Sequence, residues 1–343
     1  MKIKENIKRI ILLFVAALLS ASSILSLASC SDDKKNLEVV GTVGKYEVHY
    51  EELRWLTMQF KDRLEETYGE GIWDNEETAA KYLPELKEAV YGSIVSNYAV
   101  LTLCDEINAN STDGSKFIDI NGEDESEIVE NYINQTIEEF GSRAAYRQGL
   151  KENYMTENLY RFMTGIDVCE SILFNYYCSM MIIDDSDEAA VDYIYENFIR
   201  TIHIYIENGK DESVDENRSL ANAIYQKLLN GDEMSELVEK YNEDMIMSKI
   251  NGYYFTKNTY SDEYENAAFA LEIGEFSEVV ETYSGFYIIM RLELKDDYIA
   301  LNFDTLKNRY LLAVFDEHID ACKDELSFVP NDYGASIDLI GMK

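Results

Sequence analysis

The chain has 343 residues, of which 66 are acidic and only 30 are Lys or Arg, so its formal net charge at pH 7 is −36. This charge argues against nucleic acid and bare anionic surfaces as partners, because both repel an acidic protein. It would instead attract cations or basic unfolded proteins, although a dispersed acidic surface often serves only solvation. The length is enough for two modest domains.

The first apolar run has the order of an export signal. Four basic residues precede an apolar stretch over residues 10–27, and residues 27–30 at its end read LASC. This ending resembles the lipobox of bacterial lipoproteins. The resemblance implies that residues 1–29 are a cleaved signal peptide and that Cys30 is diacylated. The mature protein would then be lipid-anchored on the extracytoplasmic face of the cell membrane. An uncleaved transmembrane anchor with an incidental cysteine is the alternative.

Residues 30–36 are expected to form a linker, and residues 37–197 are expected to be mainly helical after two short strands at 39–43 and 46–48. Only two prolines occur in the chain, which favours long helices. Apolar residues recur at helical spacing, most clearly in one stripe: Leu86, Val90, Ile94, Tyr98 and Leu101. Pro84 suits the first turn of the helix that carries this stripe. The helices predicted in this part cover residues 50–69, 84–108, 127–140, 142–163, 167–183 and 188–197.

The pattern changes near Phe198, where alternating β-branched residues predict a strand at 201–206. The remaining elements predicted in this part are helices over residues 215–230, 234–241 and 261–271 and extended segments over residues 253–256, 276–280 and 286–292. This order within fewer than 100 residues predicts a small α+β domain with an antiparallel sheet. A last helix is expected over 303–326. It carries an apolar stripe formed by Phe303, Leu306, Tyr310, Ala313 and Val314.

Several short runs in this second part carry a family resemblance. They are HIYI (203–206), GDEMSEL (231–237), YNED (241–244), ENAAFAL (265–271), GEFSE (274–278) and SGFYII (284–289). Their order resembles a parvulin-type peptidyl-prolyl isomerase domain over residues 198–294. The segment 39–53 resembles the start of the helical chaperone domain of PrsA- and SurA-type proteins. With its lipobox, the whole chain is similar to the PrsA-type foldase lipoproteins.

The resemblance implies an α+β fold in which the parvulin-like domain is inserted into a helical chaperone domain. Residues 37–197 and 297–343 would form the chaperone domain, because the family places the last helix back on the N-terminal part. In parvulins a central pair of histidines lies under an Asp or a Cys. The resemblance places His203 at the first histidine and Asp244 at the Asp/Cys position, while Tyr287 replaces the second histidine.

The same resemblance implies a proline-binding group. Tyr260 and Tyr264 stand at the positions of the Met and Phe that grip proline, and Phe255 and Phe269 complete the expected substrate-binding residues. Rotation about an X-Pro bond crosses a barrier of about 18–20 kcal/mol and needs no nucleophile. No cofactor and no metal are therefore expected. His49 and His318 lack partner spacing and are expected to be non-catalytic.

The function implied by the resemblance is that of an extracytoplasmic folding factor. It would bind unfolded secreted proteins and isomerise their X-Pro bonds, and a homodimer is one option for its assembly. Two alternatives stay open. The first is a non-catalytic holdase with a degenerate parvulin-like domain, which the tyrosines at 260 and 287 favour. The second is a solute-binding lipoprotein, which would need two α/β lobes with parallel strands.

The cysteines after Cys30 and the acidic run 184–187 are two further groups of residues that could form a disulfide or a metal site. The four cysteines after Cys30 fit no zinc spacing and lie in apolar helical segments, which favours buried free thiols. A disulfide between Cys169 and Cys178, or between Cys104 and Cys322, is the alternative. The acidic run 184–187 lacks the spacing of an EF-hand, so a solvated loop is favoured over a weak calcium site.

Overall fold

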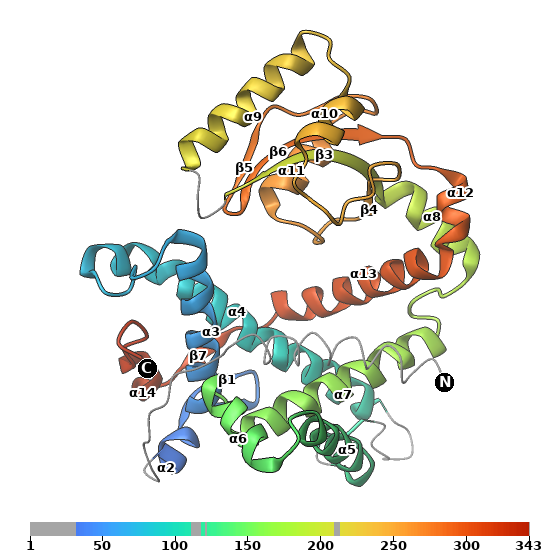
Figure 1. Cartoon of the computed structure of the whole chain (residues 1–343). Coiled ribbons are helices and arrows are strands. Elements are labelled where there is room, and N and C mark those ends of the chain that lie inside the picture. Colours follow the sequence, from blue (N-terminus) through green and yellow to red (C-terminus); the bar gives the residue numbers. More distant parts are fainter. Residues whose placement is uncertain (1–31, 111–117, 121, 209–212, 343) are drawn as a thin grey trace. The chain divides into compact units, whose positions relative to one another are not determined.

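The structure is a computed structural model, and it describes residues 32–110, 118–120, 122–208 and 213–342. The chain divides into two compact units (Figure 1). Unit 1 consists of Met1–Ile183 and Val314–Lys343, and unit 2 consists of Asp184–Ala313. The predicted signal peptide and Cys30 lie outside the described residues. Within the described ranges, no helix is both long and apolar enough to cross a membrane.

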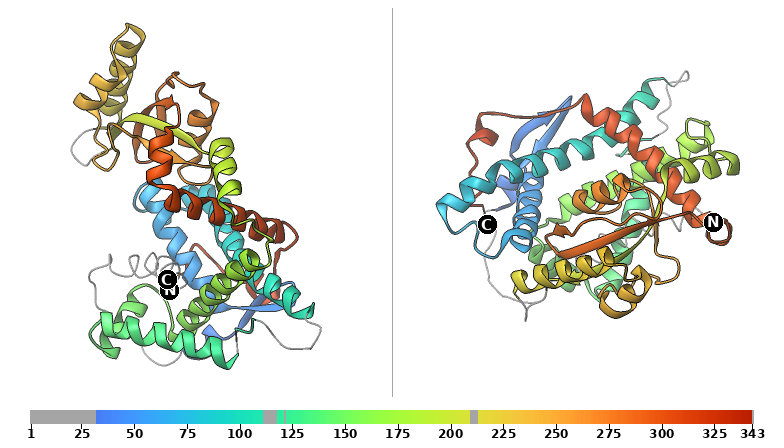
Figure 2. Two further views of the ribbon diagram at one scale, coloured as in Figure 1. Left: turned by 90° about the vertical axis from the view of Figure 1, so that its right-hand side faces the viewer. Right: turned by 90° about the horizontal axis from the view of Figure 1, so that it is seen from above.

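Unit 1 combines helices with a three-stranded antiparallel sheet in the order β2-β1-β7. The two N-terminal strands of this sheet are drawn in blue in Figure 2. Its elements in chain order are α2 (Asp32–Asn36), β1 (Val39–Val43), β2 (Tyr46–His49), α3 (Tyr50–Tyr68), α4 (Glu76–Ala109), α5 (Glu123–Glu139), α6 (Arg143–Glu152), α7 (Glu157–Ser179), β7 (Phe328–Pro330) and α14 (Asp332–Ser336). The helix α13 (Phe303–Asp324) crosses the boundary between the units.

The core of unit 1 is built on α4, which packs against α3 and α7. All five residues of the predicted α4 stripe are buried, so that stripe is confirmed. The predicted start of this helix is wrong, because α4 begins at Glu76 and Pro84 lies inside it. The Asn75 side chain caps the helix by accepting hydrogen bonds from the amides of Glu77 and Thr78, at 2.9 and 3.3 Å.

The predicted break between residues 163 and 167 is also wrong, since α7 runs through it without interruption. The chain breaks earlier, between α6 and α7. Tyr154 adopts a left-handed backbone with φ of 58°. Thr156 then caps α7 by accepting a hydrogen bond from the amide of Leu159 at 2.9 Å.

The C-terminal segment completes unit 1. β7 pairs with β1, with Thr42 opposite Val329. Gly334 of α14 lies so close to this sheet that a Cβ atom there would come within 1.8 Å of the carbonyl oxygen of Val40. Farther back in the chain, the ring of Phe315 in α13 packs edge-to-face against Phe174, with 5.4 Å between ring centroids. The last part of the chain is therefore structurally part of unit 1.

Unit 2 has a four-stranded antiparallel sheet in the order β4-β3-β6-β5. Its elements in chain order are α8 (Asp187–Asn197), β3 (Ile199–Glu207), α9 (Val214–Leu229), α10 (Met234–Tyr241), β4 (Tyr253–Phe255), α11 (Asp262–Ala270), β5 (Val280–Thr282), β6 (Gly285–Leu292) and α12 (Asp296–Leu301). The predicted α+β class is confirmed. Every strand pairing among the described residues is antiparallel, which removes the basis for a solute-binding fold with parallel strands.

Unit 2 is larger than the segment 198–294 because neighbouring helices share its core. Ile194, Phe198, Ile299 and Leu306 pack together with Tyr254 in one buried cluster. The ring centroids of Tyr193 and Tyr310 lie 4.8 Å apart. Leu306 and Tyr310 of the predicted α13 stripe therefore pack within unit 2, whereas Val314 of the same stripe belongs to unit 1.

The cysteines and the acidic run 184–187 have structural roles. The four described cysteines form no disulfide, and two of them, Cys104 and Cys169, are buried. Neither of the two disulfides considered is formed. In the acidic run, Ser186 caps α8 and Asp187 forms an ion pair with Lys307 at 2.7 Å.

A buried carboxyl group joins β2, α3 and α4 in unit 1. Glu52 is 2% exposed, and its two oxygens accept hydrogen bonds from the Asn97 amide and the Tyr98 hydroxyl, both at 2.9 Å. Burial nevertheless raises the pKa of Glu52 to about 7, because two neutral donors do not replace bulk water around a charge. The neighbouring charged or titratable groups are Glu51, which raises this pKa further, and His49, which lowers it.

The substitution Glu52→Gln should change how the stability of unit 1 depends on pH. Between the ordinary pKa of about 4.5 and the folded value of about 7, the folded protein keeps a proton that the unfolded chain releases. The free energy of unfolding of the wild type therefore falls as pH rises through this window, by about 3 kcal/mol from this group. The variant lacks this pH-dependent loss of stability, so its free energy of unfolding relative to that of the wild type should increase with pH.

Urea unfolding followed by tryptophan fluorescence measures this effect in unit 1, because both tryptophans, Trp55 and Trp73, belong to it. Titrating groups that do not interact with Glu52 cancel in the difference between the two proteins. Glu88→Gln, at an exposed position of α4, is the control and should leave the pH dependence unchanged. Parallel curves for the wild type and Glu52→Gln would contradict the prediction.

Candidate active site in unit 2

The alternation of β3 places its residues on two different faces of the sheet. Ile202, Ile204 and Ile206 project to one face, where they pack in a core cluster with residues of α9 and α10. His203 projects to the other face and is 2% exposed. Its strand partner on β6 is Ile289. The histidine is thus fixed in the middle of the sheet, on the face that α11 covers.

A chain of hydrogen bonds runs through His203. Its Nδ1 lies 3.0 Å from the hydroxyl of Tyr264, which in turn lies 2.9 Å from Oγ1 of Thr201. Its Nε2 lies 3.2 Å from Oδ2 of Asp244, and the Tyr253 hydroxyl donates to the same oxygen at 2.8 Å. Five polar side chains from β3, β4, α11 and the loop after α10 are therefore joined.

Asp244 anchors this network with a charge. Its Oδ1 accepts hydrogen bonds from the backbone amides of Ile246 and Met247, at 2.9 and 3.1 Å. The bond from His203, together with those from Tyr253 and the two amides, holds the pKa of Asp244 well below its usual range despite partial burial.

The direction of the hydrogen bonds follows from the charge on Asp244. An ionised carboxylate only accepts, so Nε2 of His203 donates to it. In the neutral imidazole Nδ1 is then the acceptor, and the Tyr264 hydroxyl donates to it while accepting from Thr201. In this tautomer every hydrogen bond of the network has one donor and one acceptor.

Tyr287 contacts His203 with its ring. The ring centroids lie 5.1 Å apart with an interplanar angle of 84°, and Tyr287 also stacks on Tyr205 at 4.5 Å. Burial raises the pKa of Tyr287 to about 12. Tyr287 meets His203 through its ring, because Asp244 and Tyr264 occupy both imidazole nitrogens.

The predicted proline-binding residues divide by exposure. Tyr264 is 3% exposed and Phe255 is fully buried, so both lie behind the surface in this structure. Tyr260 is 37% exposed and Phe269 is half-buried. The Tyr260 ring lies 4.9 Å from Phe255 and 5.2 Å from Tyr264, centroid to centroid. All four belong to one aromatic group, but Tyr264 acts in it as a hydrogen-bonding residue more than as an apolar wall.

Three residues of this site were missed from the sequence. Thr201 lies two positions before His203, so the alternation of the strand could have identified it. Tyr253 reaches Asp244 because Gly252, with φ of 66°, brings β4 very close to the carbonyl oxygen of Thr201. The Met247 sulfur, 3.4 Å from the amide nitrogen of His203, carried no sequence signal.

Tyr264→Phe should test the network without removing the ring. The substitution leaves Thr201 and His203 with a buried hydrogen-bonding group unsatisfied, so unit 2 should lose about 1–3 kcal/mol of stability. Hydrogen exchange of the β3 amides at increasing urea measures this loss. The control is Tyr283→Phe, because Tyr283 is 67% exposed and should tolerate the change. An equal, small effect of both substitutions would count against the network.

Comparison with known proteins adds family relationships to this geometry. The family model described as "Rotamase: PPIC-type PPIASE domain" matches residues 203–293. The chain is 25% identical to the foldase protein PrsA of Caldanaerobacter subterraneus subsp. tengcongensis, over 92% of this chain and 95% of the relative. It is 26% identical to the PrsA of Halalkalibacterium halodurans, over 80% of this chain and 71% of that protein.

Among solved structures, the peptidylprolyl isomerase PrsA from Bacillus anthracis aligns with 70% of this chain and 96% of its own, at 16% identity. The TM-score of this alignment is 0.33. The segment that the PPIC-type PPIase model matches lies within unit 2, and the predicted resemblance to a PrsA-type foldase with a parvulin-type domain is confirmed.

Proposed function

We propose that this chain is an extracytoplasmic folding factor that binds unfolded secreted proteins and isomerises their X-Pro bonds. The hydrogen-bonded network around His203 carries the proposal, because four of its five residues lie within residues 203–293, which the PPIC-type PPIase model matches. The curated relatives bear the name foldase and align with most of this chain, which supports the same function for the whole protein.

Isomerisation is slow because the planar amide loses its resonance when it twists. A site accelerates the rotation only through interactions that favour the twisted amide over the planar one. Resonance places negative charge on the carbonyl oxygen of the planar amide, and twisting withdraws part of it. An ionised Asp244 beside that oxygen would therefore raise the energy of the planar amide more than that of the twisted amide, which lowers the barrier to rotation. Its side chain is 18% exposed, which leaves it within reach of a bound peptide.

The surroundings of Asp244 suit an unfolded, apolar client. Tyr260 and Tyr287 are only partly buried and offer ring faces for proline. In the loop after Asp244, Met245 and Ile246 are 91% and 87% exposed. Exposed apolar side chains next to a site indicate an interaction surface more than a solvated loop. We propose that these two residues contact the residues that flank the client proline.

Catalysis should depend on the charged end of the network. His203→Ala and Asp244→Ala should lower kcat/KM by roughly tenfold to hundredfold, because the first removes the orienting partner and the second removes the charge. The wild-type rate is expected to be low, and Tyr287→His should raise it if the site is only degraded. A protease-coupled assay with proline tetrapeptides measures these rates.

The control for these variants is His318→Ala, which removes a histidine that packs on Tyr177 in unit 1. It should leave isomerisation unchanged. Suppression of client aggregation should survive all four substitutions, since client binding is proposed to lie mainly in the helical part. The proposed site is lost if His203→Ala folds normally and isomerises at the wild-type rate.

The second candidate function is a holdase without catalysis. Two observations favour it: Tyr287 stands at the position of the second histidine, and both nitrogens of His203 are bound within the protein. Isomerisation at background level with full aggregation suppression would establish this function in place of the first.

We also propose that the mature protein is held to the cell membrane by lipid on Cys30, with the PPIase domain of residues 198–294 inserted in a helical chaperone domain. The relatives' role as foldases and the LASC sequence support the anchor. Mass spectrometry of the membrane-purified protein should find a diacylated Cys30 as its N-terminus. Cys30→Ala should leave the protein unprocessed or release it. Any other mature N-terminus would rule out the anchor.

A further inference from the structure

We propose that a cavity in unit 1 binds a basic side chain of an unfolded client together with an apolar neighbour of that side chain. This inference rests on the proposed foldase function and gives it a sequence preference. The cavity has a volume of about 480 Å³, which is within the range of ordinary ligand sites. It is formed by β2, the first turn of α3, α4, α5 and α7.

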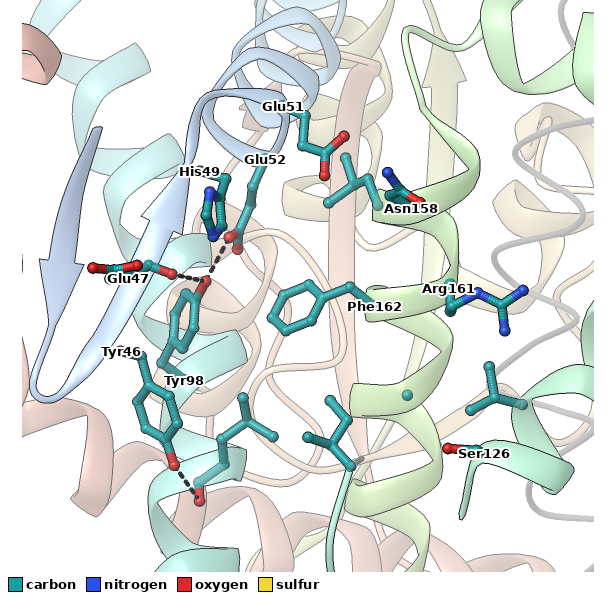
Figure 3. Close-up of a pocket in the computed structure, with 15 residues that line it drawn as sticks. Tyr46, Glu47, His49, Glu51, Glu52, Tyr98, Ser126, Asn158, Arg161 and Phe162 are labelled. Atoms are coloured by element: carbon teal, nitrogen blue, oxygen red, sulfur yellow. Dashed lines mark hydrogen bonds between the residues drawn. The ribbon is translucent and has the colours of Figure 1, made fainter. Parts of the chain in front are cut away.

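The cavity has an acidic end and an apolar body. Figure 3 shows Glu51 and Glu52 projecting from the start of α3, with Phe162 of α7 pointing across toward Tyr98. Leu101, Val129 and Leu159 add aliphatic walls. This combination fits a side chain with an apolar stem and a cationic head, because the stem gains burial and the head meets carboxylates.

Neither of the two carboxyl groups forms an ion pair within the part of the chain that the structure describes. Glu51 is 9% exposed and accepts a hydrogen bond from the Thr156 hydroxyl at 2.5 Å, while Glu52 accepts only from Asn97 and Tyr98. Among the described residues, no Lys, Arg or His forms an ion pair with either of them. Buried carboxyl groups usually have a charged partner, and its absence here leaves room for one supplied by a ligand.

The other charged groups of the cavity do not fill this role. Arg161 is paired with Glu130. His49 lowers the pKa of both Glu51 and Glu52 but forms no ion pair with either, and its Nδ1 lies 3.0 Å from the carbonyl oxygen of Leu37. Glu47 is exposed and adds a further negative charge. The net charge of −36 draws basic segments toward the protein as a whole. A cationic client segment is therefore the occupant that the charges favour.

The experiment measures binding of three nine-residue fluorescein-labelled peptides to the whole chain by anisotropy. The peptides are identical except for a central Lys, Gln or Glu next to a Phe. The wild type should bind the Lys peptide about tenfold more tightly than the Gln peptide and the Glu peptide least. The double substitution Glu51→Gln with Glu52→Gln should remove this preference. Phe162→Ala should weaken the binding of all three peptides to the same extent.

The matched control is Glu76→Gln with Glu77→Gln, which removes the same charge from the exposed first turn of α4. It should keep the Lys preference. The proposal is overturned if the cavity variant keeps the preference or if the control loses it equally. Circular dichroism checks folding, and Glu51→Gln alone, expected to lose part of the preference, replaces the double variant if that one is unfolded.

Aggregation suppression by the wild type, measured in parallel, tests the foldase function separately from the cavity. Normal suppression without a Lys preference would refute the cavity and leave the foldase function standing. The absence of both suppression and peptide binding would refute the foldase function itself.

Discussion

Burial of a single imidazole is the constraint on which the arrangement of unit 2 depends. His203 is almost fully enclosed, so each ring nitrogen needs a partner inside the protein. One partner comes from the loop after α10 and the other from α11. The histidine thereby ties two separate elements to the central strand. The site is rigid because the loss of either partner would leave a buried polar atom unsatisfied.

Two carboxyl groups illustrate how donors and burial together set a charge state. Asp244 receives bonds from an imidazole, a phenol and two backbone amides while remaining partly exposed, and its pKa moves down. Glu52 receives bonds from one amide and one phenol in a more deeply buried position, and its pKa moves up. Asp244 is therefore suited to a permanent negative charge, whereas Glu52 is suited to a negative charge that a cationic partner stabilises.

The sequence was informative wherever periodicity or a family motif was strong. The α4 stripe, the antiparallel α+β unit and the pairing of His203 with Asp244 were all predictable from it. Helix starts were less predictable, because Asn75 and Thr156 act through local capping that apolar spacing does not report. The role of Tyr264 was obscured for another reason. A tyrosine at a phenylalanine position suggests an apolar wall, and only the fold reveals that its hydroxyl meets His203.

The pairing of β1 with β7 has a consequence for the order in which the protein folds. Gly41 is opposite Pro330, so the sheet of unit 1 closes only when nearly the whole chain is available. Unit 2 is a continuous segment and has no such requirement. Long-range closure is slow because its loop entropy is lost before the contacts form. During this delay the edge of β1 is unpaired and open to other strands, so the foldase would itself pass through an aggregation-prone stage while it matures.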